Sequence, residues 1–126
     1  MSIPVTEHII HAPKIRQVYW CKFPETEFSN EFGYDQKLRP VVVISKQNRL
    51  HGTVVIVPFS TVNQTRTEVS VKLISPILGE CSWVVCSHPT TVSTRRLIPD
   101  KKLGVVRMEY SVFQRVKDKI LSNLPD

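Results

Sequence analysis

The hydrophobic pattern of the chain predicts a series of short β-strands. Residues 41–44 are Val-Val-Val-Ile, and such β-branched side chains pack well in a strand that is buried on both faces. The stretch EVSVKL at 68–73 alternates apolar and polar residues, which indicates a strand with one face towards solvent. Strands are predicted at 17–23, 40–45, 53–59, 68–73 and 82–86, and a short sixth strand at 90–93.

The period of the pattern changes near the C-terminus. From Arg107 the chain reads RMEYSVFQRVKDKILSNL, and Pro125 follows. Its apolar stripe has the spacing of an amphipathic helix and consists of Val112, Phe113, Val116, Ile120 and Leu121. The sequence therefore predicts a mainly β fold, a small twisted barrel with a C-terminal α-helix packed on it.

The length of 126 residues suits a single domain, 1–126. Residues 1–14 carry Pro4 and Pro13 without clear periodicity, so we interpret them as an N-terminal arm. The polar segment 23–39 is a long loop between two strongly predicted strands, and loops of this kind often carry function.

The composition of the chain indicates which kind of partner it binds and in which cellular compartment it is found. Lys and Arg number 17 against 11 Asp and Glu, a net charge of +6, which favours an anionic partner such as nucleic acid or an acidic protein. No apolar stretch approaches the ~20 residues needed to span a bilayer, and the N-terminus does not have the pattern of a secretory signal. We therefore expect a cytoplasmic protein without membrane contact.

The cysteine pattern argues for free thiols. Three cysteines are an odd number, which is unlike a disulfide framework. The spacing of Cys81, Cys86 and His88 fits no zinc motif, and in a strand Cys81 and Cys86 point to opposite faces. Glycine-rich phosphate loops and the common hydrolase motifs are absent. The sequence predicts neither a metal site nor a cofactor.

The candidate catalytic residues lie at the ends of two predicted strands. Pro40 cannot donate a backbone hydrogen bond and suits the first residue of a strand, so Arg39 is expected at the strand mouth with its five donors facing outwards. If 40–45 and 53–59 form an antiparallel hairpin, Arg39 lies near Ser60 and Thr61. A guanidinium beside a hydroxyl suits a phosphate. The alternatives are that Arg39 is simply a solvated charge and that Ser60 and Thr61 merely end a strand.

Four sequence blocks carry a family resemblance when they are read in order. VYWCKFP, LRPVVVIS, VVIVPFST and SWVVCSHPTTVSTRRL resemble the MazF/PemK family of toxins from type II toxin–antitoxin pairs, over residues 15–97 and the closing helix. The resemblance implies an SH3-like barrel, a homodimer and metal-independent cleavage of single-stranded RNA at short sequences. It also implies that Arg39 is catalytic and that Ser60, with Thr61 beside it, stands where many members carry a catalytic Thr.

The implied reaction assigns roles to further residues. The 2′-hydroxyl of RNA is the nucleophile, Arg39 stabilises the phosphorane, and Ser60 holds a non-bridging oxygen. His88 is the first candidate for the general base because of its residue type, and Glu31 is the second. Contacts to RNA are expected from Lys46, Arg49, Arg66, Arg95 and Arg96 at phosphates and from Phe32 or Tyr34 by stacking. Trp20 and Trp83 are expected in the core.

The resemblance also implies a partner, an antitoxin with an acidic disordered C-terminal segment that folds over the basic groove. Contact with DNA is expected only through that antitoxin.

Two other functions are compatible with the same barrel fold. A gyrase poison of the CcdB type acts through its C-terminal residues, but this chain ends in SNLPD without a terminal aromatic residue. The second is a nucleic-acid-binding barrel without catalytic activity.

Overall fold

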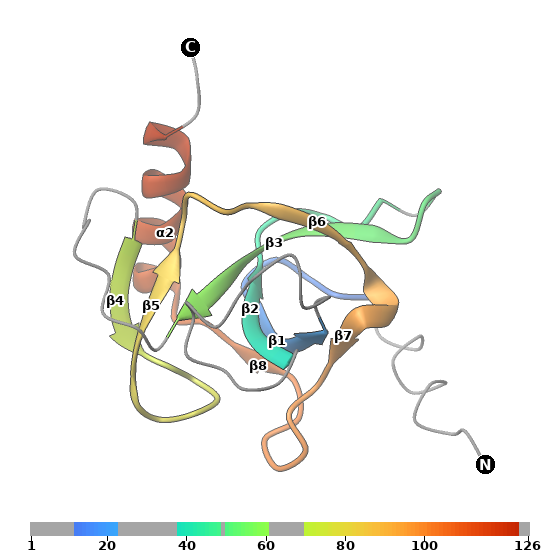
Figure 1. The fold of residues 1–126 in the computed structure, drawn as a ribbon, viewed down its shortest axis with the longest axis horizontal. Helices are drawn as coiled ribbons and strands as arrows, with labels where there is room; N and C mark the ends of the chain where they lie inside the picture. The colour runs from blue at the N-terminus through green and yellow to red at the C-terminus, as the bar shows by residue number, and fades with distance from the viewer. Residues whose placement is uncertain (1–11, 23–37, 49, 61–69, 124–126) are drawn as a thin grey trace.

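The fold was derived from a computed structural model that describes residues 12–22, 38–48, 50–60 and 70–123. Within these ranges, eight strands form one antiparallel sheet that curls on itself, and helix α2 (Tyr110–Ser122) packs against it (Figure 1). The strands are β1 (Gln17–Lys22), β2 (Leu38–Val43), β3 (Thr53–Ser60), β4 (Ser70–Ile74), β5 (Cys81–Val85), β6 (Thr90–Ser93), β7 (Leu97–Ile98) and β8 (Val106–Arg107). A short 3₁₀ helix, η2 (Thr94–Arg96), joins β6 to β7.

The sheet curls because β3 changes partners along one edge. The order is β4-β5-β3-β2-β1-β7, while β6 pairs with β3 and β8 pairs with β1. The first half of β3 pairs with β6, from Thr53 to Ile56, and its last two residues pair with β5. The prediction of a mainly β fold of the SH3-like type with a C-terminal helix is confirmed.

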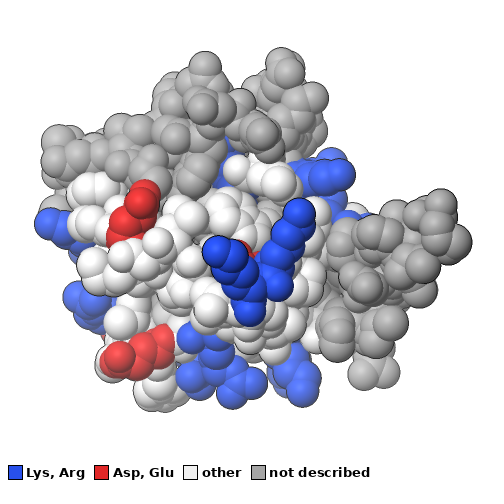
Figure 2. All heavy atoms as spheres, turned by 90° about the horizontal axis from the view of Figure 1, so that it is seen from below, with Lys and Arg blue, Asp and Glu red and all other residues white. Residues whose placement is uncertain are grey.

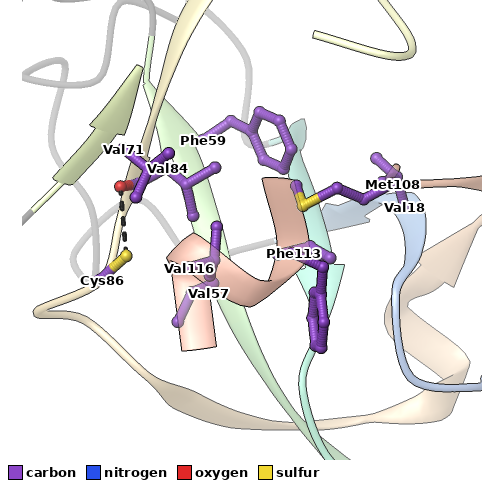
Figure 3. Close-up of a cluster of buried hydrophobic side chains, with 10 residues drawn as sticks. Val18, Val57, Phe59, Val71, Val84, Cys86, Met108, Phe113 and Val116 are labelled. Atoms are coloured by element: carbon purple, nitrogen blue, oxygen red, sulfur yellow. Dashed lines mark hydrogen bonds between the residues drawn. The ribbon is translucent and has the colours of Figure 1, made fainter. Parts of the chain in front are cut away.

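The two faces of the sheet bury two separate hydrophobic clusters. In β2 the side chains alternate, so Val41 and Val43 belong to a cluster inside the curl while Val42 belongs to a cluster under α2. All three are fully buried, which confirms the interpretation of this run as a strand buried on both faces. The cluster under α2 brings Phe113 and Val116 of the helix against the sheet (Figure 3).

Several predicted boundaries differ from the structure for identifiable reasons. Strand β2 begins at Leu38 rather than Pro40; this proline is tolerated inside a central strand because the ladder to β3 begins one residue later, at Val41. The two-residue strands β7 and β8 were not predicted because such short strands show no periodicity. Leu121 is 56% exposed and lies off the buried stripe, because five residues from Val116 is about 140° around a helix.

The three cysteines are free, and Cys86 and Cys81 lie on opposite faces as predicted. Cys86 is buried in the cluster under α2, where its thiol donates to the carbonyl oxygen of Val84 at 3.6 Å (Figure 3). Burial raises the pKa of the Cys86 thiol to about 11, and the charge of Lys119 partly opposes this rise. Cys86 is therefore a packing residue, while Cys81 is exposed.

Candidate functional site

The hairpin of β2 and β3 brings the two principal candidate residues together. The register of this hairpin pairs Val43 with Ile56 and Val41 with Pro58. Continued by two residues, the same register sets Arg39 opposite Ser60, and residues that face each other across antiparallel strands share one face of the sheet. The predicted hairpin is confirmed, and the approach of Arg39 to Ser60 follows from continuing its register, while the roles of these two residues stay a prediction.

The orientation of Arg39 differs from the prediction. Its donors were expected to face outwards, but the residue is only 3% exposed and Ser60 is fully buried. The reason is the two-residue period of a strand: Arg39 alternates with Val41 and Val43, whose side chains fill the inside of the curl. Nε and Nη1 of Arg39 are buried without a hydrogen-bond acceptor, although the residue has other interactions.

Arg39 and Ser60 belong to a row of residues that crosses the sheet. On one side Arg39 pairs with Cys21 of β1, which in turn pairs with Leu97 of β7. On the other side Ser60 pairs with Trp83 of β5, and Trp83 pairs with Lys72 of β4. We refer to Cys21, Arg39, Ser60, Trp83 and Lys72 as the cross-strand row.

His88 is not brought to Arg39 and Ser60. It lies in the turn after β5, is exposed, and has its Nδ1 3.0 Å from the Ser87 hydroxyl oxygen. Because β5 runs antiparallel to β3, the chain from Trp83 to His88 leads back along β3 and away from Ser60. Sequence reasoning chose His88 by residue type, and the register that separates it from Ser60 was not visible in the sequence.

The residues predicted to contact RNA phosphates fall into two places. Arg95 and Arg96 lie in η2, directly before Leu97, so this turn is two strand spacings, about 10 Å, from the strand that carries Arg39. Lys46 is exposed but lies beyond the other end of β2 from Arg39. The structure therefore associates η2 with the cross-strand row and leaves Lys46 apart from it.

The remaining predicted site residues lie outside the described residues. They are Glu31, Phe32, Tyr34, Arg49, Thr61 and Arg66. Segment 23–37 precedes β2 and segment 61–69 follows β3, so both join the described chain next to Arg39 or Ser60.

Both tryptophans were expected in the core, and this is wrong for each. Trp20 is half-buried, and its indole Nε1 donates to a carboxylate oxygen of Asp100 at 3.0 Å. Trp83 is half-buried beside the edge strand β4, where the ammonium of Lys72 lies 5.8 Å from the centre of its ring. Neither belongs to a core cluster. The alternating stretch 68–73 already indicated that Lys72 faces outwards. The pairing of β4 with β5, which sets Trp83 beside Lys72, was not visible in the sequence.

Charge on the surface agrees with the net charge of the chain. Lys and Arg side chains outnumber Asp and Glu side chains on the face seen in Figure 2. The carboxyl group of Asp100 accepts hydrogen bonds from the Trp20 indole and from the backbone of Leu103, and these hydrogen bonds lower its pKa.

Within the described ranges no three His, Cys, Asp or Glu side chains converge on a possible metal position. No helix in the described part of the chain is long and apolar enough to cross a membrane.

A family model decides the relationship of the chain. The model described as "PemK-like, MazF-like toxin of type II toxin-antitoxin system" matches residues 14–124. The chain belongs to the PemK/MazF toxin family. This confirms the resemblance seen in the four sequence blocks, and the match includes the closing helix, α2.

Solved structures of MazF toxins share the fold of this family member. A MazF from Deinococcus radiodurans is 19% identical, with a TM-score of 0.66 over 89% of this chain and 96% of that chain. An endoribonuclease from a mycobacterial species, in complex with its cognate antitoxin, is 21% identical, with a TM-score of 0.64 over 91% and 99% of the two chains. The Mycobacterium tuberculosis toxin MazF-mt6 is 17% identical, with a TM-score of 0.61 over 85% and 94%. No curated protein sequence matches significantly.

Proposed function

We propose that this PemK/MazF family toxin is a metal-independent, sequence-selective endoribonuclease that cuts single-stranded RNA in the cytoplasm and so inhibits translation and growth. The observation that carries the proposal is the register of the β2–β3 hairpin, which, continued by two residues, sets the buried guanidinium of Arg39 opposite the buried hydroxyl of Ser60. Fixed donors in a site of low dielectric stabilise developing charge more strongly than the same donors in water. The mycobacterial structure described as an endoribonuclease has the same fold.

The proposed chemistry uses the nucleophile that RNA carries. The 2′-hydroxyl loses its proton and attacks the adjacent phosphorus, the bond from phosphorus to the 5′-oxygen breaks, and this oxygen takes up a proton, so a 2′,3′-cyclic phosphate and a 5′-hydroxyl form. Arg39 stabilises the charge on the pentacoordinate phosphorus and Ser60 donates to a non-bridging oxygen, so the electrostatic work is done by the protein's own donors. Arg95 and Arg96, two strand spacings away, bind flanking phosphates.

We further propose that the toxin forms a homodimer and is neutralised by a cognate antitoxin. Solved relatives include a MazE–MazF complex from Deinococcus radiodurans and a mycobacterial endoribonuclease with its cognate antitoxin. A net charge of +6 suits an acidic antitoxin segment, which would compete with RNA for the same positive surface. Added antitoxin is therefore expected to suppress RNA cleavage.

The decisive experiment incubates the purified protein with a long single-stranded RNA in EDTA and maps the ends of the products. The proposal expects cuts at a short recurring sequence, with a 2′,3′-cyclic phosphate on the 5′ fragment. The Arg39→Met variant, folded by circular dichroism, is expected to give no products. Tight, salt-sensitive RNA binding without products would instead indicate a non-catalytic binding protein. Gyrase-dependent DNA breakage without RNA cleavage would indicate the CcdB type of action.

A further inference from the structure

The cross-strand row leads from the Arg39–Ser60 pair to the exposed edge of the sheet. Arg39 and Ser60 are buried, Trp83 is half-buried, and Lys72 is exposed. Since these residues face one another across β2, β3, β5 and β4, their side chains lie on one face of the sheet. The row therefore sets an aromatic ring next to Ser60, and a cation one strand further out, on the side of the proposed position of the scissile phosphate.

We propose that Trp83 and Lys72 form an RNA subsite in which a base next to the cut stacks on the Trp83 indole and Lys72 neutralises a neighbouring phosphate. This proposal rests on the proposed function, because the scissile phosphate is positioned by Arg39 and Ser60. Three strand spacings separate the strands of Arg39 and Lys72, about 14 Å. That distance exceeds the 3.4 Å step of one stacked nucleotide, so the row contacts more than one nucleotide.

The present partner of the Trp83 ring can be displaced by a base. The Lys72 ammonium lies 5.8 Å from the ring centre, and a cation–π contact at an exposed position contributes about 0.5–1 kcal/mol. Stacking of a base on an aromatic side chain contributes about 1–3 kcal/mol. The exchange therefore favours the base, and the flexible stem of Lys72 lets the displaced ammonium reach a phosphate.

A positive groove lies around the edge strand β4 from Trp83, on the face of the sheet that carries α2, and Lys72 at that edge borders it. A groove of about 530 Å³ runs between β4 and α2, and the charged residues that line it are Lys72, Arg115, Lys119 and Asp118. Three cations against one carboxylate make the groove attractive to a phosphodiester backbone. The strand of RNA that leaves Trp83 is thus met by positive charge.

Trp20 provides the matched control within the same chain. It pairs with Pro40, one position along from the Cys21–Arg39 pair, so it lies on the opposite face of the sheet from the cross-strand row. Its indole is already hydrogen-bonded to Asp100. The chain has only these two tryptophans, so each can be observed alone in a single-substitution variant.

The binding test uses tryptophan fluorescence and a short 2′-O-methyl oligoribonucleotide of mixed sequence, which cannot undergo 2′-hydroxyl attack. In Trp20→Phe only Trp83 emits, and its fluorescence is expected to be quenched in a saturable titration. In Trp83→Phe only Trp20 emits, and its signal is expected to stay constant. Equal quenching in both variants would indicate a general effect and would overturn the subsite.

The kinetic test separates binding from chemistry. Trp83→Ala is expected to raise KM for RNA about 5- to 100-fold, corresponding to the loss of one stacked base, with kcat changed less than about threefold. Trp83→Tyr is expected to restore most of the KM. Lys72→Gln is expected to lower the slope of log affinity against log salt by about 0.7, while Lys101→Gln, at another exposed lysine, leaves KM unchanged. A fall in kcat with unchanged KM in Trp83→Ala would contradict a binding role.

The outcomes distinguish this subsite from the proposed function. RNA cleavage with constant Trp83 fluorescence and unchanged KM in Trp83→Ala would overturn the subsite and leave the endoribonuclease standing. Quenching of Trp83 without cleavage of any RNA would support the subsite and refute the endoribonuclease. Absence of both cleavage and quenching would overturn both.

Discussion

Replacing Arg39 by methionine is expected to abolish activity without unfolding the protein. The side chain is 3% exposed and has interactions within the fold. Burying a guanidinium carries a desolvation cost that offsets much of what those interactions contribute. Met carries no charge and fills much of the same volume. The free energy of unfolding should therefore change by less than about 2 kcal/mol.

Activity, in contrast, should be lost. Loss of a single donor to a developing oxyanion typically lowers kcat by about 10²–10³, and Arg39→Met removes several donors together with the charge. The two assays are urea unfolding followed by tryptophan fluorescence and RNA cleavage in EDTA. The control is Lys22→Met, which removes an exposed cation from β1 and should change the unfolding free energy by less than about 0.5 kcal/mol.

Two results would refute this reasoning. A loss of more than about 2 kcal/mol of stability in Arg39→Met, with Lys22→Met unchanged, would mean that the guanidinium stabilises the fold. Undiminished cleavage by a folded Arg39→Met protein would mean that catalysis does not use Arg39. A folded and inactive variant would instead indicate that this arginine serves function rather than stability.

The remaining predictions concern other parts of the same chain. Ser60→Ala should lower single-turnover cleavage by about 10²–10³, whereas Ser60→Thr, which keeps the hydroxyl, should stay within about tenfold. His88→Gln should also stay within about tenfold, because β5 carries His88 away from Ser60; a loss of about 10²–10⁴ with one limb of the pH–rate profile missing would restore it as the general base. Phe113→Ala should lower the unfolding free energy by about 3–5 kcal/mol in urea, while Leu121→Ala, at a 56% exposed position, should change it by less than about 0.5 kcal/mol. Burial raises the pKa of Cys86 from 9.0 to about 11, so the stability linked to its neutral thiol is complete below about pH 9 and is lost as the pH rises through about 11. Burial also raises the pKa of Tyr19, so both proteins lose stability at high pH, and urea unfolding across this range should show a larger loss in wild type than in Cys86→Ala.

Local sequence signals predicted most of the architecture. Strand β6 has its predicted bounds, and β3 differs by a single residue at its end, because both stretches are rich in β-branched residues. The hairpin of β2 and β3 was predictable since strands that follow each other along the chain usually pair. From that pairing alone, the juxtaposition of Arg39 and Ser60 followed.

The sequence did not predict the features that depend on the curvature of the sheet and on pairing between distant strands. The two-residue period of a strand indicates that Arg39 shares a face with Val41. Only the curl of the sheet makes that face the inside of the fold and buries the guanidinium. The partner exchange along β3 brings Trp83 beside Ser60 and directs His88 away from it.

The sequence by itself determined the kinds of elements, the family of the chain and the residue types available for chemistry, because side-chain periodicity and local motifs are encoded in near neighbours. The tertiary structure decided which of those residues meet. Trp83 and Lys72 join Arg39 and Ser60 only because β5 and β4 add to the edge of β3 in one register, and a shift of that register by one residue would turn Trp83 to the other face.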